Sequence, residues 1–232
     1  MINYDKKRGD NMSVKTQATV SLIINFLIAA VTTGIIISYF FTESTFIKST
    51  TEIFRFFTTD SNILAAVAAV VVMIFDIKII RGKTEKIPQA AIFFKFAGTA
   101  CLMITFLTSL FYLVPMYGFS FIFGGTFFHM HMTAPLMSLF SLCLFEKSDR
   151  LSFIKSHLAY VPMAAYAAVY FVMVNVIGEA NGGWRDLYSF GENGIVFITI
   201  AIIAEDIIVV NLLRIAYNLG IKKQNKQSDS NN

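Results

Sequence analysis

The chain has 232 residues, of which 56% are hydrophobic, 15% aromatic and only 15% charged. Soluble domains are typically about 45–50% apolar and about 25% charged, so the composition excludes a disordered chain, a nucleic-acid-binding domain and an ordinary soluble enzyme. The net charge of +4 is small. The two cysteines lie in apolar runs and are expected to be buried thiols, not a disulfide framework.

Six apolar runs are each long enough to cross a membrane as a helix, which takes about 20 residues. They cover residues 16–40, 54–80, 90–114, 119–144, 158–177 and 194–217. Because a backbone in lipid must satisfy its own hydrogen bonds, and the alternating segments of a β-barrel are missing, these runs are expected to be helices. The sequence therefore predicts an all-α polytopic membrane bundle over 16–217, with a polar tail at 1–15 and a mobile basic tail at 218–232.

The placement of basic residues predicts the orientation of this bundle. Most of the 19 basic residues lie in the two tails and in the connections that follow the second and fourth runs. Cytoplasmic segments of membrane proteins carry an excess of Lys and Arg, so both termini are predicted to lie in the cytoplasm. An even number of spans agrees with this orientation.

The second run opens with consecutive polar residues, which are Thr58, Thr59, Asp60, Ser61 and Asn62. On a helix, Thr58, Ser61 and Asn62 share one face. Polar groups in a membrane span usually face the interior of the bundle, where they can bond one another. Alternatively, Thr59 and Asp60 cap a helix that begins after residue 54.

The fourth run carries two histidines, His129 and His131, with Pro135 four residues after the second. Two residues apart on a helix, they point to roughly opposite sides and make a poor chelating pair, so neither a metal nor another cofactor is expected. Pro135 lacks an N–H group and should kink the helix one turn below His131, which would open a pocket there. The alternative is a histidine that only bonds a neighbouring helix.

Two further features stand out near the end of the chain. Glu205 and Asp206 lie near the middle of the sixth run, where charges are costly, and Lys95 in the third run is a candidate partner. They fit a structural ion pair or hydrogen-bond network, a proton relay or a group that orients His131. In the preceding loop, Trp184 and Tyr188 fit either an anchor at the membrane interface or a lid over the entrance to a pocket.

Several of these motifs follow one another in an order that resembles a known family. They are Phe-Arg-Phe-Phe-Thr-Thr-Asp-Ser-Asn-Ile-Leu at 54–64, His131 with Pro135, the pair Tyr166 and Tyr170, and Trp184 ahead of Tyr188-Ser189-Phe190. In this order they resemble a family of bacterial six-span membrane proteins. That family is similar to the androgen-induced and androgen-dependent threonine hydrolases of animals, which act on fatty acid esters of hydroxy fatty acids. The resemblance covers residues 20–220.

The resemblance implies a location in the bacterial plasma membrane and a lipid or lipid-like ester as substrate. It implies Thr58 as nucleophile, with Thr59 as a second candidate, and His131 as base. Asn62, one turn from Thr58, is a candidate oxyanion donor. The supporting residues would be Thr59, His129, Glu205 and Asp206, with Trp184 and Tyr188 at the substrate entrance. Ser189 stands where the bacterial pattern has a proline.

The sequence leaves three functions open. The first is a membrane-embedded Thr/His hydrolase of lipid esters, which requires Thr58 and His131 to meet and therefore the second and fourth helices to be neighbours. The second is a proton-coupled carrier that uses Glu205, Asp206 and Lys95 as a charge path. The third is a non-catalytic membrane scaffold. Nothing in the sequence indicates the oligomeric state.

Overall fold

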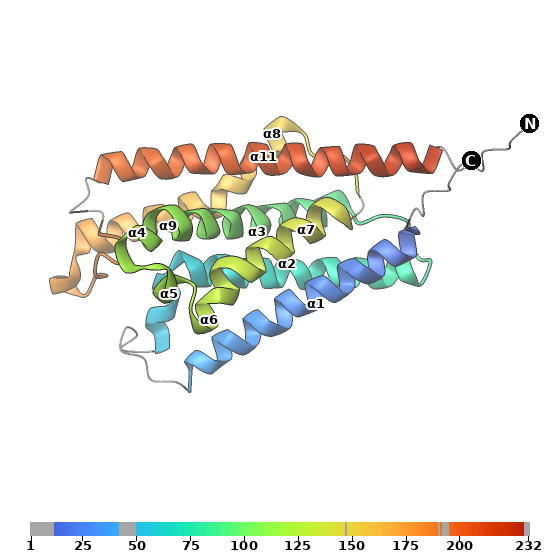
Figure 1. Ribbon diagram of the computed structural model, residues 1–232. Helices are drawn as coiled ribbons and strands as arrows, with labels where there is room; N and C mark the ends of the chain where they lie inside the picture. The colour runs from blue at the N-terminus through green and yellow to red at the C-terminus, as the bar shows by residue number, and fades with distance from the viewer. Residues whose placement is uncertain (1–11, 42–49, 147, 190, 192–194, 230–232) are drawn as a thin grey trace, which may run out of the picture.

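The computed structural model of the chain describes residues 12–41, 50–146, 148–189, 191 and 195–229, and all regular structure within them is helical (Figure 1). The long helices are α1 (Val14–Tyr39), α2 (Phe57–Ile80), α3 (Gln89–Thr108), α7 (Ala134–Leu144), α9 (Val161–Phe171) and α11 (Ile195–Asp229). Shorter α-helical pieces are α4 (Val114–Tyr117), α5 (Phe119–Ile122), α6 (Gly125–Phe128) and α8 (Phe153–His157).

Stretches of wider or tighter helix join several of these elements. The wider ones, with i→i+5 bonding, are η2 (Ser109–Leu113), η3 (His129–Thr133) and η5 (Val172–Ile177). The tighter 3₁₀ ones are η1 (Thr50–Arg55), η4 (Leu158–Tyr160) and η6 (Glu179–Asn181). Two of the wide turns immediately precede a helix that has proline in its first turn, at Pro115 and Pro135. Because proline donates no hydrogen bond to the preceding turn, the helix widens there.

Among the described residues, 5 helical stretches are long and apolar enough to cross a membrane. They are Val14–Tyr39, Phe57–Ile80, Gln89–Tyr117, Gly125–Leu144 and Phe153–Ile177. They correspond to the first five predicted runs, and α11 covers the sixth. The chain is thus compatible with an integral membrane protein, whereas the count of six spans and the cytoplasmic termini stay predictions.

The distribution of side chains supports a membrane environment. The buried face of α1 carries the polar residues Ser21, Asn25 and Thr32, while Phe26 and Leu27 are exposed on the same helix. The other long helices also expose large apolar side chains. Contiguous apolar surface on this scale marks contact with lipid or with a partner rather than with water. Polar groups inside and apolar groups outside are what a bundle surrounded by hydrocarbon requires.

The helices pack around α3, whose residues are the most buried of the spanning stretches. Helix α1 packs on α2 and α7, α2 packs on α3, and α11 packs on α3, α7 and α8. Small residues allow the closest approach, since a Cβ atom added at Gly98 of α3 would lie 3.1 Å from the Cα of Ala65 in α2. In Figure 1, α11 runs the length of the bundle and ends at the end where α1 begins.

Several predicted boundaries differ from the structure. Helix α2 begins at Phe57, after Phe56, whose side chain makes no capping bond. The capping alternative for Thr59 and Asp60 is therefore wrong, because both lie within the first turn of the helix. Helix α11 continues to Asp229, so helical structure covers part of the predicted tail at 218–232. Residues 1–11 of the N-terminal tail lie outside the described residues.

The predicted continuous helix over 119–144 is broken between α5 and α6. Gly124 has an extended backbone (φ −91°, ψ 153°) and Gly125 has φ +54°, in the left-handed region that glycine adopts most easily. This pair ends the first segment and starts the second in a new direction. The kink expected at Pro135 takes the form of the wide turn η3, which contains both histidines.

Candidate functional site

The N-terminal turn of α2 and the wide turn η3 bring together the two residues of the predicted pair. Thr58 Oγ1 lies 3.2 Å from His131 Nε2. His131 is buried, with 5% of its surface exposed, and Thr58 is partly buried. The distance is at the limit of a hydrogen bond between a hydroxyl and a base, which falls at about 2.6–3.2 Å. The second and fourth spanning stretches are therefore neighbours at this point, as the hydrolase hypothesis requires.

The other ring nitrogen of His131 determines how the pair can function. Nδ1 lies 2.7 Å from the carbonyl oxygen of Ile122, at the end of α5. A carbonyl only accepts hydrogen bonds, so the proton of the neutral ring belongs on Nδ1 and Nε2 keeps its lone pair toward Thr58. The ring of Phe127 stacks on the imidazole at 5.5 Å, and Phe123 meets it edge-on. These contacts hold the ring in the orientation in which Nε2 can accept the Thr58 proton.

Asn62 does not have the predicted role of oxyanion donor. Its Nδ2 donates to the carbonyl oxygens of Thr58 at 2.8 Å and Met130 at 3.1 Å, so both N–H groups are already used. Flipping the amide would place its oxygen against two carbonyls, which fixes the assignment. Asn62 is thus a positioning residue that ties the first turn of α2 to η3 and so sets the separation of Thr58 and His131.

The two other supporting residues on these helices lie apart from the pair. His129 Nε2 is 3.1 Å from Thr32 Oγ1 and so bonds α1 rather than α2. Thr59 is buried, and its N–H group bonds the carbonyl of Phe56. Of the two candidate threonines, Thr58 is the one that contacts His131. Within the described residues, no group of three or more His, Cys, Asp or Glu side chains could hold a metal ion.

A cavity of about 500 Å³ adjoins Thr58. It lies among α2, α3 with η2, α9 and α11, and its lining is mainly apolar and aromatic. Glu205 and Asp206 are its two acidic lining residues, and Thr108, which also lines it, donates to Glu205 at 3.0 Å. Pockets for small ligands commonly have about 300–1,000 Å³ and a few polar groups in an apolar wall. Thr58 and the two acids therefore face the same space.

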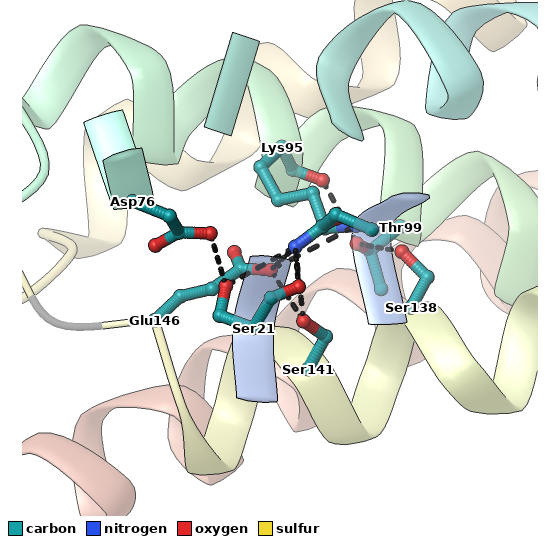
Figure 2. A network of polar contacts seen from close by, with 8 residues as sticks. Ser21, Asp76, Lys95, Thr99, Ser138, Ser141 and Glu146 are labelled. Carbon is teal, nitrogen blue, oxygen red and sulfur yellow. Dashed lines mark hydrogen bonds and ion pairs between the residues drawn. The ribbon is translucent and has the colours of Figure 1, made fainter. Parts of the chain in front are cut away.

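The predicted ion pair between Lys95 and these acids is not formed. Lys95 Nζ donates to Asn25 Oδ1 at 2.7 Å and lies 3.8 Å from Glu146 Oε1, in a separate polar cluster (Figure 2). The notion of a charge path from Lys95 to Glu205 and Asp206 is therefore wrong. Glu205 contacts Thr108 rather than His131, so the structure gives it no part in orienting the histidine.

The loop before α11 is fastened to the site end of the bundle by tyrosines. The Tyr188 hydroxyl accepts a bond from the Phe57 N–H at 3.2 Å, and its carbonyl accepts from Tyr112 at 2.7 Å. Tyr170 accepts from the Leu187 N–H at 2.7 Å and donates to Asp186 at 3.0 Å. Burial raises the pKa of Tyr188, so its hydroxyl stays protonated at neutral pH.

The two predicted entrance residues lie on different cavities. Tyr188 lines the cavity of Thr58. Trp184 lines a neighbouring one of about 400 Å³ that also contains Asp60, and its ring meets Tyr170 at 6.1 Å. Sequence reasoning missed the cap that Tyr188 places on α2 and the carbonyl of Ile122. The glycines at 124 and 125 were the available signal for the second, because a helix that ends there leaves free carbonyls.

Comparison with known proteins adds no family to this description. The chain matches no protein-family model, no curated protein and no solved structure. The resemblance of its motifs to the six-span threonine hydrolases thus stays a prediction.

Proposed function

We propose that this chain is a membrane-embedded hydrolase of lipid esters, with Thr58 as nucleophile and His131 as general base. The observation that carries the proposal is the 3.2 Å contact of the Thr58 hydroxyl with the unprotonated Nε2 of His131. A threonine hydroxyl is a weak nucleophile until an adjacent base takes its proton. We further propose that the chain belongs with the six-span threonine hydrolases, in a bacterial plasma membrane with both termini in the cytoplasm.

The proposed reaction has two halves. Thr58 Oγ1 attacks the ester carbonyl carbon while its proton passes to His131 Nε2, and the bond to the alcohol oxygen then breaks. The imidazolium returns that proton to the departing alcohol, which leaves an acyl group on Thr58. A water molecule, deprotonated by His131, attacks the acyl carbon. The bond to Thr58 Oγ1 then breaks as the imidazolium returns its proton to that oxygen, which releases the fatty acid and restores Thr58. Ile122 stabilises the imidazolium by accepting from Nδ1 throughout.

The helix terminus supports this chemistry. Thr58 is the second residue of α2, in the turn whose N–H groups have no partner within the helix. The positive end of the helix dipole favours the negative charge that develops on the carbonyl oxygen. The Phe57 N–H is occupied by Tyr188, so we assign the oxyanion to the N–H of Thr58 itself. The apolar lining of the adjacent cavity suits an acyl chain.

The test is covalent labelling of the purified protein, in detergent, with a fluorophosphonate probe. Thr58→Val removes the hydroxyl but keeps the shape, and should abolish labelling. His131→Gln should slow it by about 10²–10⁴-fold, the usual contribution of a general base. Thr59→Val is the matched control and should label like the wild type, which would then be taken into a screen of lipid esters. Equal labelling of Thr58→Val and wild type, both monodisperse, would overturn the proposal.

One observation favours a second candidate function, a proton-coupled carrier. Glu205 and Asp206 line the cavity, and the Glu205 Oε1 and Asp206 Oδ1 atoms are buried without hydrogen-bond partners. Ionisable groups in such positions commonly mark ion or proton pathways in membrane proteins. Proton-driven uptake of a small molecule into liposomes, lost in Glu205→Gln but retained in Thr58→Val, would favour the carrier over the hydrolase.

A further inference from the structure

A second group of ionisable side chains lies far from Thr58, toward the other end of α2. Asp76 follows Thr58 by 18 residues in the same helix, which is about 27 Å along its axis at about 1.5 Å per residue. With Lys95 of α3 and Glu146, just after α7, it forms a cluster in the bundle interior (Figure 2). The Lys95 and Glu146 side chains are 0% exposed, and Asp76 is 1% exposed. The hydrolase mechanism uses none of these residues.

Side chains of α1 and α7 hold the cluster in place through hydrogen bonds. Asn25 of α1 accepts from Lys95 and donates to Glu146 Oε1 at 3.0 Å. Ser141 donates to the same Glu146 oxygen at 2.8 Å, and Ser21 donates to Asp76 Oδ2 at 2.7 Å. Thr99 and Ser138, 2.8 Å apart, join α3 to α7 beside it. The donors that reach the two acids, Ser21, Asn25 and Ser141, thus bond only one oxygen of each carboxylate.

The charges of the cluster do not balance. Two carboxylates and one ammonium group leave a net charge of −1 in a space closed to water, which is expensive in a protein interior and more so within a membrane. The second oxygen of each acid, Asp76 Oδ1 and Glu146 Oε2, is buried without a hydrogen-bond partner. A ligand of charge +1 on these oxygens would neutralise the cluster.

We propose that the Asp76–Glu146 pair binds one proton, so that the cluster is neutral in the folded protein. The hydroxyl and amide groups around the pair favour a proton over a metal cation. The Ser21 and Ser141 hydroxyls already accept from Asn25 and donate to the acids, so they offer few lone pairs to a metal. The Lys95 ammonium group, 3.8 Å from Glu146 Oε1, also repels a metal cation bound to the acids. A proton needs only one of the two free carboxylate oxygens.

Few other groups around the cluster could balance its charge. Helix α1 presents the uncharged Ser21 and Asn25, α2 presents Asp76 and α3 presents Lys95. Two more titratable groups lie within electrostatic reach of Glu146, namely Cys143 of α7 and Tyr217 of α11. Asp149, beyond Glu146, is exposed and bonded to Lys86 at 2.7 Å. Neither the thiol nor the phenol carries a charge at neutral pH in such a setting, so they leave the imbalance in place.

The proton has a consequence for stability. The folded protein would bind one proton more than the unfolded chain at neutral pH, where both acids are ionised once they reach water. Stability must then fall as the pH rises, because unfolding releases that proton. Over the range in which the folded state keeps it, the unfolding equilibrium constant should increase about tenfold per pH unit.

The test compares wild type with Asp76→Asn and Glu146→Gln, each of which leaves one acid against Lys95 and so needs no proton. Infrared spectroscopy in detergent should show a protonated carboxylic acid band in the wild type that is reduced in both variants. In both variants, the stability measured by thermal unfolding should no longer decline as the pH rises. Asp149→Asn, an exposed acid, is the control and should keep the band and the decline.

Salt titrations in the same assay separate a proton from an alkali cation. If the proposal holds, sodium and potassium chloride at constant ionic strength will give the same midpoint of unfolding. If neither variant reduces the band, or if sodium or potassium selectively stabilises the wild type, the proposal is overturned. A variant that fails to fold leaves the other to decide, and the wild-type band and salt response need no variant.

Discussion

The two ends of α2 use the same kinds of polar residue to opposite effect. At the Thr58 end the surrounding elements are short or irregular, with the wide turns η2 and η3, the broken α5–α6 segment and a loop held by tyrosines. At the Asp76 end, α1, α2, α3 and α7 are regular helices that close around a fully buried cluster. Beside Thr58 there is a cavity, whereas the polar groups around Lys95 are buried and hydrogen-bonded, except for Asp76 Oδ1 and Glu146 Oε2.

This contrast shows how a polar side chain that stabilises the bundle differs in its surroundings from one proposed to react. A side chain that stabilises a bundle must use all of its hydrogen-bonding groups, as Asn25 does with Lys95, Glu146 and two serines. The proposed nucleophile needs a space that a substrate can enter, and Thr58 lines such a cavity. Irregular backbone contributes, because it frees carbonyls such as that of Ile122 to orient a side chain such as His131.

The sharpest way to break the contrast is Lys95→Met, which removes the cation from the closed cluster. The two buried acids would then lose the cation that balances their charge, and we expect a loss of about 3–5 kcal/mol of stability, typical for one partner of a buried ion pair. Thermal unfolding in detergent measures it. Lys86→Met, which breaks the exposed pair with Asp149, should cost less than about 1 kcal/mol. Similar losses in the two variants would contradict a stabilising role for the buried cluster.

A second substitution tests how Asn62 supports the site. Asn62→Asp replaces two N–H donors with an oxygen that faces the carbonyls of Thr58 and Met130. We expect a loss of about 1–3 kcal/mol together with slower fluorophosphonate labelling, since η3 would move away from α2. Asn181→Asp, at an exposed amide that bonds one carbonyl away from the cavity, is the matched control. If Asn62→Asp labels at the wild-type rate, Asn62 does not position the pair.

The two histidines of η3 should differ in their effect on labelling. Thr32→Val removes the hydroxyl that bonds His129 on α1. We expect a loss of about 0.5–1.5 kcal/mol, the net worth of one hydrogen bond, with unchanged labelling. Unfolding and labelling of the same preparation measure both effects. A decrease in labelling as large as that of His131→Gln would show that His129 takes part in the chemistry.

The smallest effect concerns the loop. Ser189 has φ +53°, a left-handed conformation that is unfavourable for a residue with a Cβ atom. Ser189→Gly should therefore raise stability by up to about 1 kcal/mol, whereas Ser189→Pro, with φ fixed near −65°, should lower it. The order of the unfolding midpoints, glycine above serine above proline, is the measurement. The reverse order would mean that another conformation of this loop dominates in solution.

Much of the fold could be predicted from the sequence because hydrocarbon imposes one simple requirement. Long apolar runs must be helices, and their few polar residues must face inward, so the shared face of Thr58, Ser61 and Asn62 indeed packs on α3 and η3. The break at Gly124 and Gly125 was overlooked, because the surrounding apolar residues continue the run without interruption. The length of an apolar run does not reveal which of its residues have a left-handed backbone conformation.

The candidate site was predictable only in part. The residue types and their resemblance to a known pattern singled out Thr58 and His131, but their contact depends on which helices are neighbours. The partner of Lys95 was missed for a related reason. Glu146 lies just beyond the apolar run, in a predicted connection, although the chain after α7 turns back and buries it. Pairings between distant helices leave no mark in a single sequence.

The wide turn η3 has a consequence for how this chain can vary. A turn with i→i+5 bonding holds one residue more than a regular helix, so it behaves as an insertion accommodated within the helix. Deleting one residue between His131 and Pro135 would restore regular bonding of 3.6 residues per turn and so remove the wide turn that holds His131 opposite Thr58. The contact between the two side chains would then be disturbed while every residue of the pair was still present. In this chain the number of residues in the interval therefore positions His131 as much as their identity does.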